Sequence, residues 1–137
     1  MNPESGIENT AKRIELPYVS IKYINPIVFF TYKEGAELGF PEIKELICSA
    51  EQLSGQKPYV TFADARVNMN ITNEGKRILE DLNNMPLFRG TAALVKTNIH
   101  KFAANLLSNY NGSKYPFRAF TSEEEAVTWL LSLPLDK

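Results

Sequence analysis

The chain has 137 residues, of which 44% are hydrophobic and 23% charged, and these are ordinary values for a globular protein. A chain of this length suits a single domain. The 15 basic and 16 acidic residues give a net charge of -1, which provides no broad positive field for nucleic acid or an anionic membrane surface. We therefore expect no nucleic-acid partner.

No stretch approaches the roughly 18 consecutive apolar residues of a membrane span, and residues 1–15 lack the apolar core of a signal peptide. The single cysteine, Cys48, excludes an internal disulfide and a metal site built from several thiolates. We expect a cytoplasmic protein with no membrane span.

Residues 1–13 contain too little apolar surface to offset the entropy of ordering them, which predicts a flexible N-terminal arm before a single domain over residues 14–135. Two β-rich runs, 18–24 and 27–32, flank Asn25-Pro26 and predict a hairpin. The second run is apolar at consecutive positions, so it is the more central strand.

Helices and strands alternate along the rest of the chain. Pro41 favours the first turn of a helix, and Gly55 favours a left-handed stop. The expected elements are a helix over 41–54, a strand over 59–63, a helix over 73–84, a strand over 92–96, a helix over 99–110, a strand over 117–120 and a helix from 121.

Two of these elements carry a stronger expectation. The run 92–96 shows no alternation, which predicts a strand buried on both faces. Apolar residues from Ile99 and Phe102 onward recur at helical spacing in 99–110, which predicts that this stripe faces the core. The order β-β-α-β-α-β-α-β-α predicts an α/β sandwich with a mostly parallel sheet of about five strands.

That order, together with Asp64 closing the third strand before a turn into a helix, resembles the STAS family, the sulfate-transporter and anti-sigma-factor-antagonist domain. The phrases at 91–97, 102–105 and 118–130 are similar to small uncharacterised bacterial proteins grouped as STAS-like or lipid-transfer-like (CRAL-TRIO) domains. The resemblance covers nearly the whole ordered chain and implies a STAS-like sandwich.

In antagonist-type STAS domains, the turn after the third strand ends in Asp-Ser-Ser-Gly, whose second serine is phosphorylated. The matching residues here run from Thr72 to Gly75, and Glu74 stands at the phosphoserine position. The usual phosphorylatable serine is therefore absent. Glu74 is either a fixed mimic of the phosphorylated state or simply an acidic residue favoured in the first turn of a helix.

The resemblance implies an interaction surface on this turn and the adjoining helix. Within the turn, Met69 and Ile71 either form an exposed contact patch or pack under the helix as core. The candidate interaction surface comprises Asp64, Arg66, Asn68, Met69, Asn70, Thr72, Asn73, Glu74 and Arg77.

A weaker candidate site lies where the fourth strand meets the next helix. Free backbone N–H groups and two lysines there could hold an anion, and the residues are Lys96, Thr97, Asn98 and Lys101. The glycine spacing matches no nucleotide-binding motif, and His, Cys and carboxylate residues form no metal-ligand cluster, so we expect no cofactor and no metal. His100 is the only histidine, and an enzyme would need it beside a hydroxyl.

The leading hypothesis is a non-enzymatic regulatory or protein-interaction domain with an unknown protein partner. The alternative is a small-ligand or lipid-binding module of CRAL-TRIO-like type. A hairpin edge strand could also pair with a second copy, which predicts a possible homodimer.

Overall fold

A computed structural model of the chain describes residues 12–110 and 115–136. Its main element is a six-stranded sheet in the order β1-β2-β3-β5-β7-β8. The first three strands pair antiparallel, and the pairs β3·β5, β5·β7 and β7·β8 are parallel. The strands are β1 (Lys12–Leu16), β2 (Val19–Ile24), β3 (Ile27–Tyr32), β5 (Tyr59–Asp64), β7 (Phe88–Leu94) and β8 (Phe117–Phe120).

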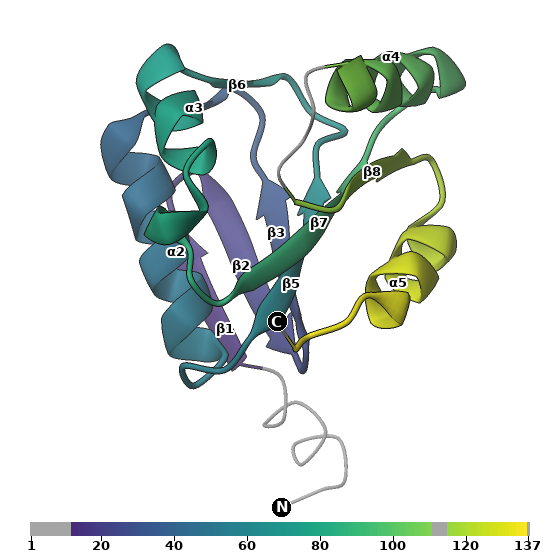
Figure 1. The fold of residues 1–137 in the computed structure, drawn as a ribbon. Helices are drawn as coiled ribbons and strands as arrows, with labels where there is room; N and C mark the ends of the chain where they lie inside the picture. The colour runs from purple at the N-terminus through teal and green to yellow at the C-terminus, as the bar shows by residue number, and fades with distance from the viewer. Residues whose placement is uncertain (1–11, 111–114, 137) are drawn as a thin grey trace, which may run out of the picture.

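Helices cover both faces of this sheet (Figure 1). Helices α2 (Phe40–Leu53) and α3 (Asn73–Leu79) lie together on one face, and α5 (Glu123–Ser132) lies on the other. Helix α4 (Asn98–Tyr110) lies beside β8 at one end of the sheet, and a short 3-10 helix, η1 (Leu82–Asn84), follows α3. A second, two-stranded parallel sheet pairs β4 (Ala36–Leu38) with β6 (Met69–Ile71).

Strand alternation divides the interior into two cores, because successive side chains point to opposite faces of a sheet. Val28 and Phe30 of β3 pack with the α2 side chains Ile43 and Leu46. The other core lies on the opposite face of the sheet. It consists of Ile27, Val60, Phe62, Ala92, Leu94, Phe120, Ala126 and Leu130. The sheet is therefore buried on both faces at its centre.

The predicted strands and helices are all present in the expected order, and the mostly parallel α/β architecture is confirmed; the strands β1, β4 and β6 were not expected. The hairpin is β2 and β3, and β3 is the more central strand, as expected. The sheet has six strands rather than about five, because β1 pairs with the outer side of β2. The sheet edge is thus β1, whose Lys12, Arg13 and Glu15 are exposed charges of the kind that discourage edge-to-edge pairing.

The expectation that the 99–110 stripe faces the core is wrong at its first turn. Ile99 is 79% exposed and Phe102 is 69% exposed. Helix α4 is bonded to β8 through Asn105, whose amide oxygen accepts the Ala119 N–H at 2.8 Å and whose amide nitrogen donates to the Ala119 carbonyl at 3.3 Å. Helical periodicity identifies an apolar face but cannot show whether another element covers it.

The expectation that the fourth strand is buried on both faces is also wrong. Strand β7 runs over Phe88–Leu94, and its second half alternates. Ala92 and Leu94 are buried against α5, whereas Thr91 and Ala93 are only half-buried on the opposite face. Short side chains hide this alternation in the sequence, because alanine and threonine are compatible with either environment. The half-buried face of β7 lines a cavity.

Candidate functional site

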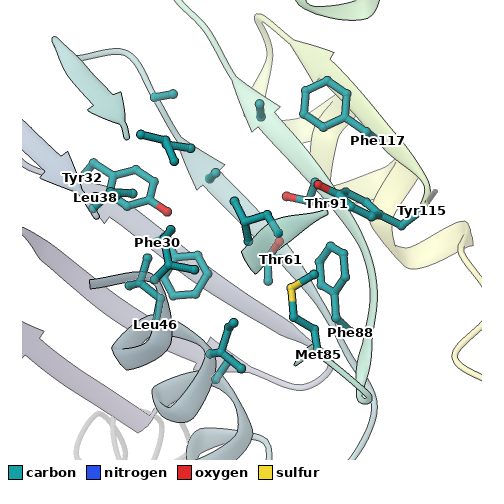
Figure 2. Close-up of a pocket in the computed structure, with 18 of the residues that line it drawn as sticks. Phe30, Tyr32, Leu38, Leu46, Thr61, Met85, Phe88, Thr91, Tyr115 and Phe117 are labelled. Carbon is teal, nitrogen blue, oxygen red and sulfur yellow. The ribbon is translucent and has the colours of Figure 1, made fainter. Parts of the chain in front are cut away.

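A cavity of about 260 Å³ lies between the sheet and the α2–α3 layer. Its floor is formed by β3, β5 and β7, and its roof by side chains of α2 and α3 with the β4–β6 sheet. Figure 2 shows Phe30, Tyr32 and Leu46 on one side of it, with Phe88, Tyr115 and Phe117 on the other. Two walls with aromatic side chains therefore flank the middle of the sheet.

The cavity exists because the two strands beneath it carry short side chains on this face. Thr61 and Ala63 of β5 lie beside Thr91 and Ala93 of β7, as register partners. The neighbouring strand β3 carries Phe30 and Tyr32 on the same face. The short threonine and alanine side chains do not reach the helices that cover this face of the sheet. Space therefore remains above them.

The walls are almost entirely hydrocarbon. Among the described residues that line the cavity, none carries a carboxylate, an amine, a guanidinium, an imidazole or a thiol. The polar atoms that line it are hydroxyls, and the side chains that bear them are Tyr32, Tyr59, Thr61, Thr91 and Tyr115. An occupant would therefore meet apolar surface interrupted by uncharged hydrogen-bonding groups.

Two of these hydroxyl side chains are deeply buried yet unpaired. Tyr32 is 9% exposed and Thr61 is 7% exposed, and neither side chain forms a hydrogen bond in the described part of the chain. No side-chain oxygen or nitrogen there is both fully enclosed and without a partner, so both oxygens open onto free space. Because both residues line the cavity, that space is the cavity. Figure 2 shows the Tyr32 hydroxyl pointing into it.

Burial also fixes the charge of the tyrosines. Removal from water raises the pKa of Tyr32 above its usual value, and it does the same for Tyr59. Both phenols therefore remain neutral hydroxyls at any physiological pH. The cavity contributes hydrogen-bond donors and acceptors but no charge.

The predicted interaction surface begins with Asp64 and Arg66, at the end of β5 and just after it. Arg66 binds Asp64 through two hydrogen bonds, Nε to Oδ1 at 2.9 Å and Nη2 to Oδ2 at 2.8 Å. This pair lowers the pKa of Asp64, chiefly through the Arg66 hydrogen bond. Asp64 and Arg66 thus form the loop-ordering ion pair rather than a free acid and base.

Thr72 begins α3 as its N-cap, since its hydroxyl accepts the Gly75 N–H at 3.1 Å. Asn73 and Glu74 follow as exposed residues in the first turn, and Arg77 is exposed one turn later. Gly75 is buried, and a Cβ there would lie 2.5 Å from the Leu38 carbonyl oxygen. The turn is therefore fixed by close packing against the end of β4.

Met69 and Ile71 belong to strand β6 and pack against the α2-side core. Both also line the cavity. The alternative left open by the sequence is thus settled in favour of core packing, while Asn68 and Asn70 are exposed on the outer side.

The weak anion-site residues lie at the start of α4. The Thr97 hydroxyl accepts the backbone N–H of His100 at 3.1 Å, so Thr97 caps the helix. Lys96 and Asn98 are exposed, and Lys101 is half-buried. Cys48 is an exposed free thiol on α2. No group of three or more His, Cys, Asp or Glu in the described residues is placed to hold a metal ion.

Sequence reasoning missed the cavity residues. The signal available was the pair of short alternating patterns, Thr61-x-Ala63 and Thr91-x-Ala93, in two strands that prove to be neighbours. Small residues at matching positions of adjacent central strands indicate space above the sheet. This signal is independent of any motif in the loops.

Comparison with known proteins supports the fold and leaves the function open. Residues 20–133 match the family described as Domain of unknown function (DUF7793). A search of curated proteins found no match. Among solved structures, the chain is similar to an uncharacterised protein of the DUF3478 family with a SpoIIAA-like fold from Shewanella loihica PV-4.

That likeness has a TM-score of 0.56 at 15% sequence identity and covers 88% of this chain and 94% of the other. It confirms the STAS-like fold predicted from the sequence. Within the described residues, no helix is both long and apolar enough to cross a membrane.

Proposed function

The chain belongs to the DUF7793 family, and we propose that it is a non-enzymatic binding domain whose small apolar ligand occupies the cavity between the sheet and α2. The observation that carries this proposal is the 260 Å³ space lined by hydrocarbon and neutral hydroxyls. Such a cavity offers apolar burial without any group suited to nucleophilic, acid–base or metal chemistry.

Cavity volume decides how large the ligand can be. An engineered apolar cavity of about 150 Å³ holds benzene. By proportion, a cavity of about 260 Å³ takes on the order of ten non-hydrogen atoms, the size of naphthalene. A ligand that fits wholly inside the cavity is therefore a small ring compound or a short chain.

The test is binding of naphthalene, measured by its fluorescence during titration with protein. Ala93→Leu places three more carbon atoms on the cavity floor and is expected to abolish binding. Ala103→Leu makes the same change at an exposed position of α4 and is expected to leave binding unchanged. Ala63→Val, a smaller intrusion, provides a second cavity variant if Ala93→Leu folds poorly. Equal binding by all variants would contradict the proposal.

A second candidate is a regulatory domain that binds a protein partner at the β5–α3 surface. Its specific support is Phe40, which is 55% exposed at the first position of α2, next to Gly39. A Cβ on Gly39 would lie 3.6 Å from the Thr72 hydroxyl, so the start of α2 is close to the start of α3. Glu74 and Arg77 add exposed charge to α3, and Arg66 is exposed just after the end of β5.

This candidate is tested by partner capture from native lysate with wild type and with Arg66→Ala combined with Glu74→Lys. Loss of a specific partner in the double variant supports the surface, and unchanged capture removes it. A homodimer stays a prediction, with β1 and β8 as the strands at the two ends of the sheet.

A further inference from the structure

We infer that the ligand of this cavity is an uncharged ring compound carrying a hydroxyl or carbonyl group, and that this group hydrogen-bonds to the Thr61 and Thr91 hydroxyls on the cavity floor. This inference rests on the proposed function, which requires only that something apolar fills the cavity. It adds the chemical class of the ligand and the residues that select it.

The first argument is the placement of the two threonines. Thr61 and Thr91 are register partners on the neighbouring parallel strands β5 and β7. Partners in adjacent strands lie about 5 Å apart between backbones, and both side chains are on the cavity face. Two hydroxyls at this separation can reach one oxygen atom held between them, one donating to it and the other accepting from it.

Within the described residues, the Thr61 and Thr91 hydroxyls have no hydrogen-bond partner. Thr61 is 7% exposed, and its hydroxyl forms no hydrogen bond within the described residues. A buried hydroxyl without a partner costs free energy, and a ligand oxygen or a trapped water removes that cost. In the floor of an otherwise hydrocarbon cavity, the hydroxyls mark the position of a polar atom of the occupant.

The uncharged lining of the cavity limits the charge of its ligand. No described residue lining the cavity carries a charge, positive or negative. A carboxylate or ammonium group held there would lose its hydration without gaining an ion pair, which is far more costly than burying a neutral hydroxyl. A ligand whose polar group lies inside the cavity is therefore expected to be an alcohol, a phenol or a ketone rather than a carboxylate or an amine.

The aromatic walls of the cavity favour a ligand of a particular shape. Aromatic side chains stand on both sides of the threonine pair, with Phe30 and Tyr32 on one side and Phe88 and Tyr115 on the other (Figure 2). Phe88 and Tyr115 are already in edge-to-face contact, with centroids 4.9 Å apart. Walls of this kind favour a flat ring between them, because aromatic pairs gain energy from stacked and edge-to-face geometry beyond the area they bury.

The buried Tyr32 hydroxyl provides a second polar position, at the end of β3 and away from the threonine pair. A ligand with polar atoms at both ends of a ring system would satisfy both positions. This places the polar atoms of the ligand along the strands, and its apolar faces toward the aromatic walls.

The experiment compares naphthalene with 2-naphthol and 2-naphthoate as probes of one ring size and different polarity. Calorimetric titration measures each dissociation constant for wild type and for the double variant Thr61→Val, Thr91→Val. Valine keeps the shape of threonine and removes the hydroxyl. Thr31→Val is the matched control, since Thr31 is exposed on β3 and does not line the cavity.

Wild type is expected to bind 2-naphthol and to bind 2-naphthoate at least about tenfold more weakly, a factor equal to about 1.4 kcal/mol. The ratio of naphthol affinity to naphthalene affinity is expected to fall about fivefold in the double valine variant, the value of one ordinary hydrogen bond of about 1 kcal/mol. The Thr31→Val protein is expected to keep the wild-type ratio.

A failure of this inference can be distinguished from a failure of the proposed function. If naphthalene binds in the cavity but the naphthol-to-naphthalene ratio is the same in the double valine variant, the threonine pair serves water and the inference is overturned while the proposed function stands. If neither naphthalene nor 2-naphthol binds, the proposed function fails. Tight binding of 2-naphthoate would overturn the requirement for a neutral ligand.

Discussion

Thr61 of β5 and Thr91 of β7 lie side by side on the floor of the cavity, and neither hydroxyl has a hydrogen-bond partner among the described residues. Thr61 is the more deeply buried of the two. Polar groups of this kind are usually retained in a core only when something binds them.

This relationship predicts the stability of Thr61→Val. Exchanging an unpaired buried hydroxyl for a methyl group removes a desolvation cost and keeps the volume. The free energy of unfolding of the ligand-free protein is therefore expected to be equal to or greater than that of wild type, measured by denaturant titration. A loss of more than about 1 kcal/mol would show that the hydroxyl already has a partner in the fold.

Gly75 packs against the end of β4, and this predicts a large effect from the smallest substitution. In Gly75→Ala the new methyl group would lie 2.5 Å from the Leu38 carbonyl oxygen and 3.1 Å from side-chain atoms of Ile43 and Ile71. Overpacking of this kind costs about 1–3 kcal/mol in the free energy of unfolding. Lys76→Ala, at the next and exposed position, is the control and is expected to change it by less than about 0.5 kcal/mol. A wild-type value for Gly75→Ala would show that α3 is not held this closely.

Thr72 caps α3, and this predicts a loss of stability when its hydroxyl is removed. Thr72→Ala removes the acceptor of the Gly75 N–H and is expected to lower the free energy of unfolding by about 1 kcal/mol. Thr72→Ser keeps the acceptor and is expected to restore most of that loss. If the serine variant were as unstable as the alanine variant, the cap would not be the cause.

The Asp64–Arg66 pair predicts a specific pH dependence. Because the pKa of folded Asp64 is lowered, the pair stabilises the fold above the ordinary carboxyl pKa, and this stabilisation is lost as the pH falls through the folded pKa. Arg66 has a half-exposed side chain, so the contribution is below about 1 kcal/mol. In Arg66→Ala, an NMR titration is expected to show a higher Asp64 pKa than in wild type. An unchanged Asp64 pKa would contradict the pairing.

The first turn of α4 predicts an unusual tolerance. Phe102 is 69% exposed, so Phe102→Ser is expected to change the free energy of unfolding by no more than about 0.5 kcal/mol. Leu130→Ala, in the buried face of α5, is expected to cost about 2–5 kcal/mol. Thermal and denaturant unfolding of both variants checks the contrast. A core-sized loss in Phe102→Ser would mean that this face is covered in solution.

Much of the fold was predictable because its signals are local. The hairpin around Asn25-Pro26, the helix that starts near Pro41, and the strand that ends at Asp64 all follow from residue type and period. The edge strand over Lys12–Leu16 was not predicted, because alternating charges on an edge give little apolar signal. The three-residue strands β4 and β6 are too short for any period to be recognised.

The candidate site was less predictable, and for a physical reason. The polar residues predicted after Asp64 include exposed ones, such as Asn68 and Asn70. The cavity, in contrast, depends on where the helices do not contact the sheet. Ala63 and Ala93 look like ordinary core alanines in the sequence. Only the arrangement of α2, α3 and the β4–β6 sheet over β5 and β7 shows that no side chain fills the space above them.

The most direct test of the account is an isotope-filtered NOE measurement on methyl-labelled protein with 2-naphthol. The methyl groups of Ala63, Ala93 and Ile43 line the cavity, so NOEs from naphthol protons to these methyl groups are expected if the ring binds there. They should disappear in Ala93→Leu. NOEs confined to Ile99, on the exposed first turn of α4, would show that the compound binds an outer apolar surface instead, and would contradict the cavity as the binding site.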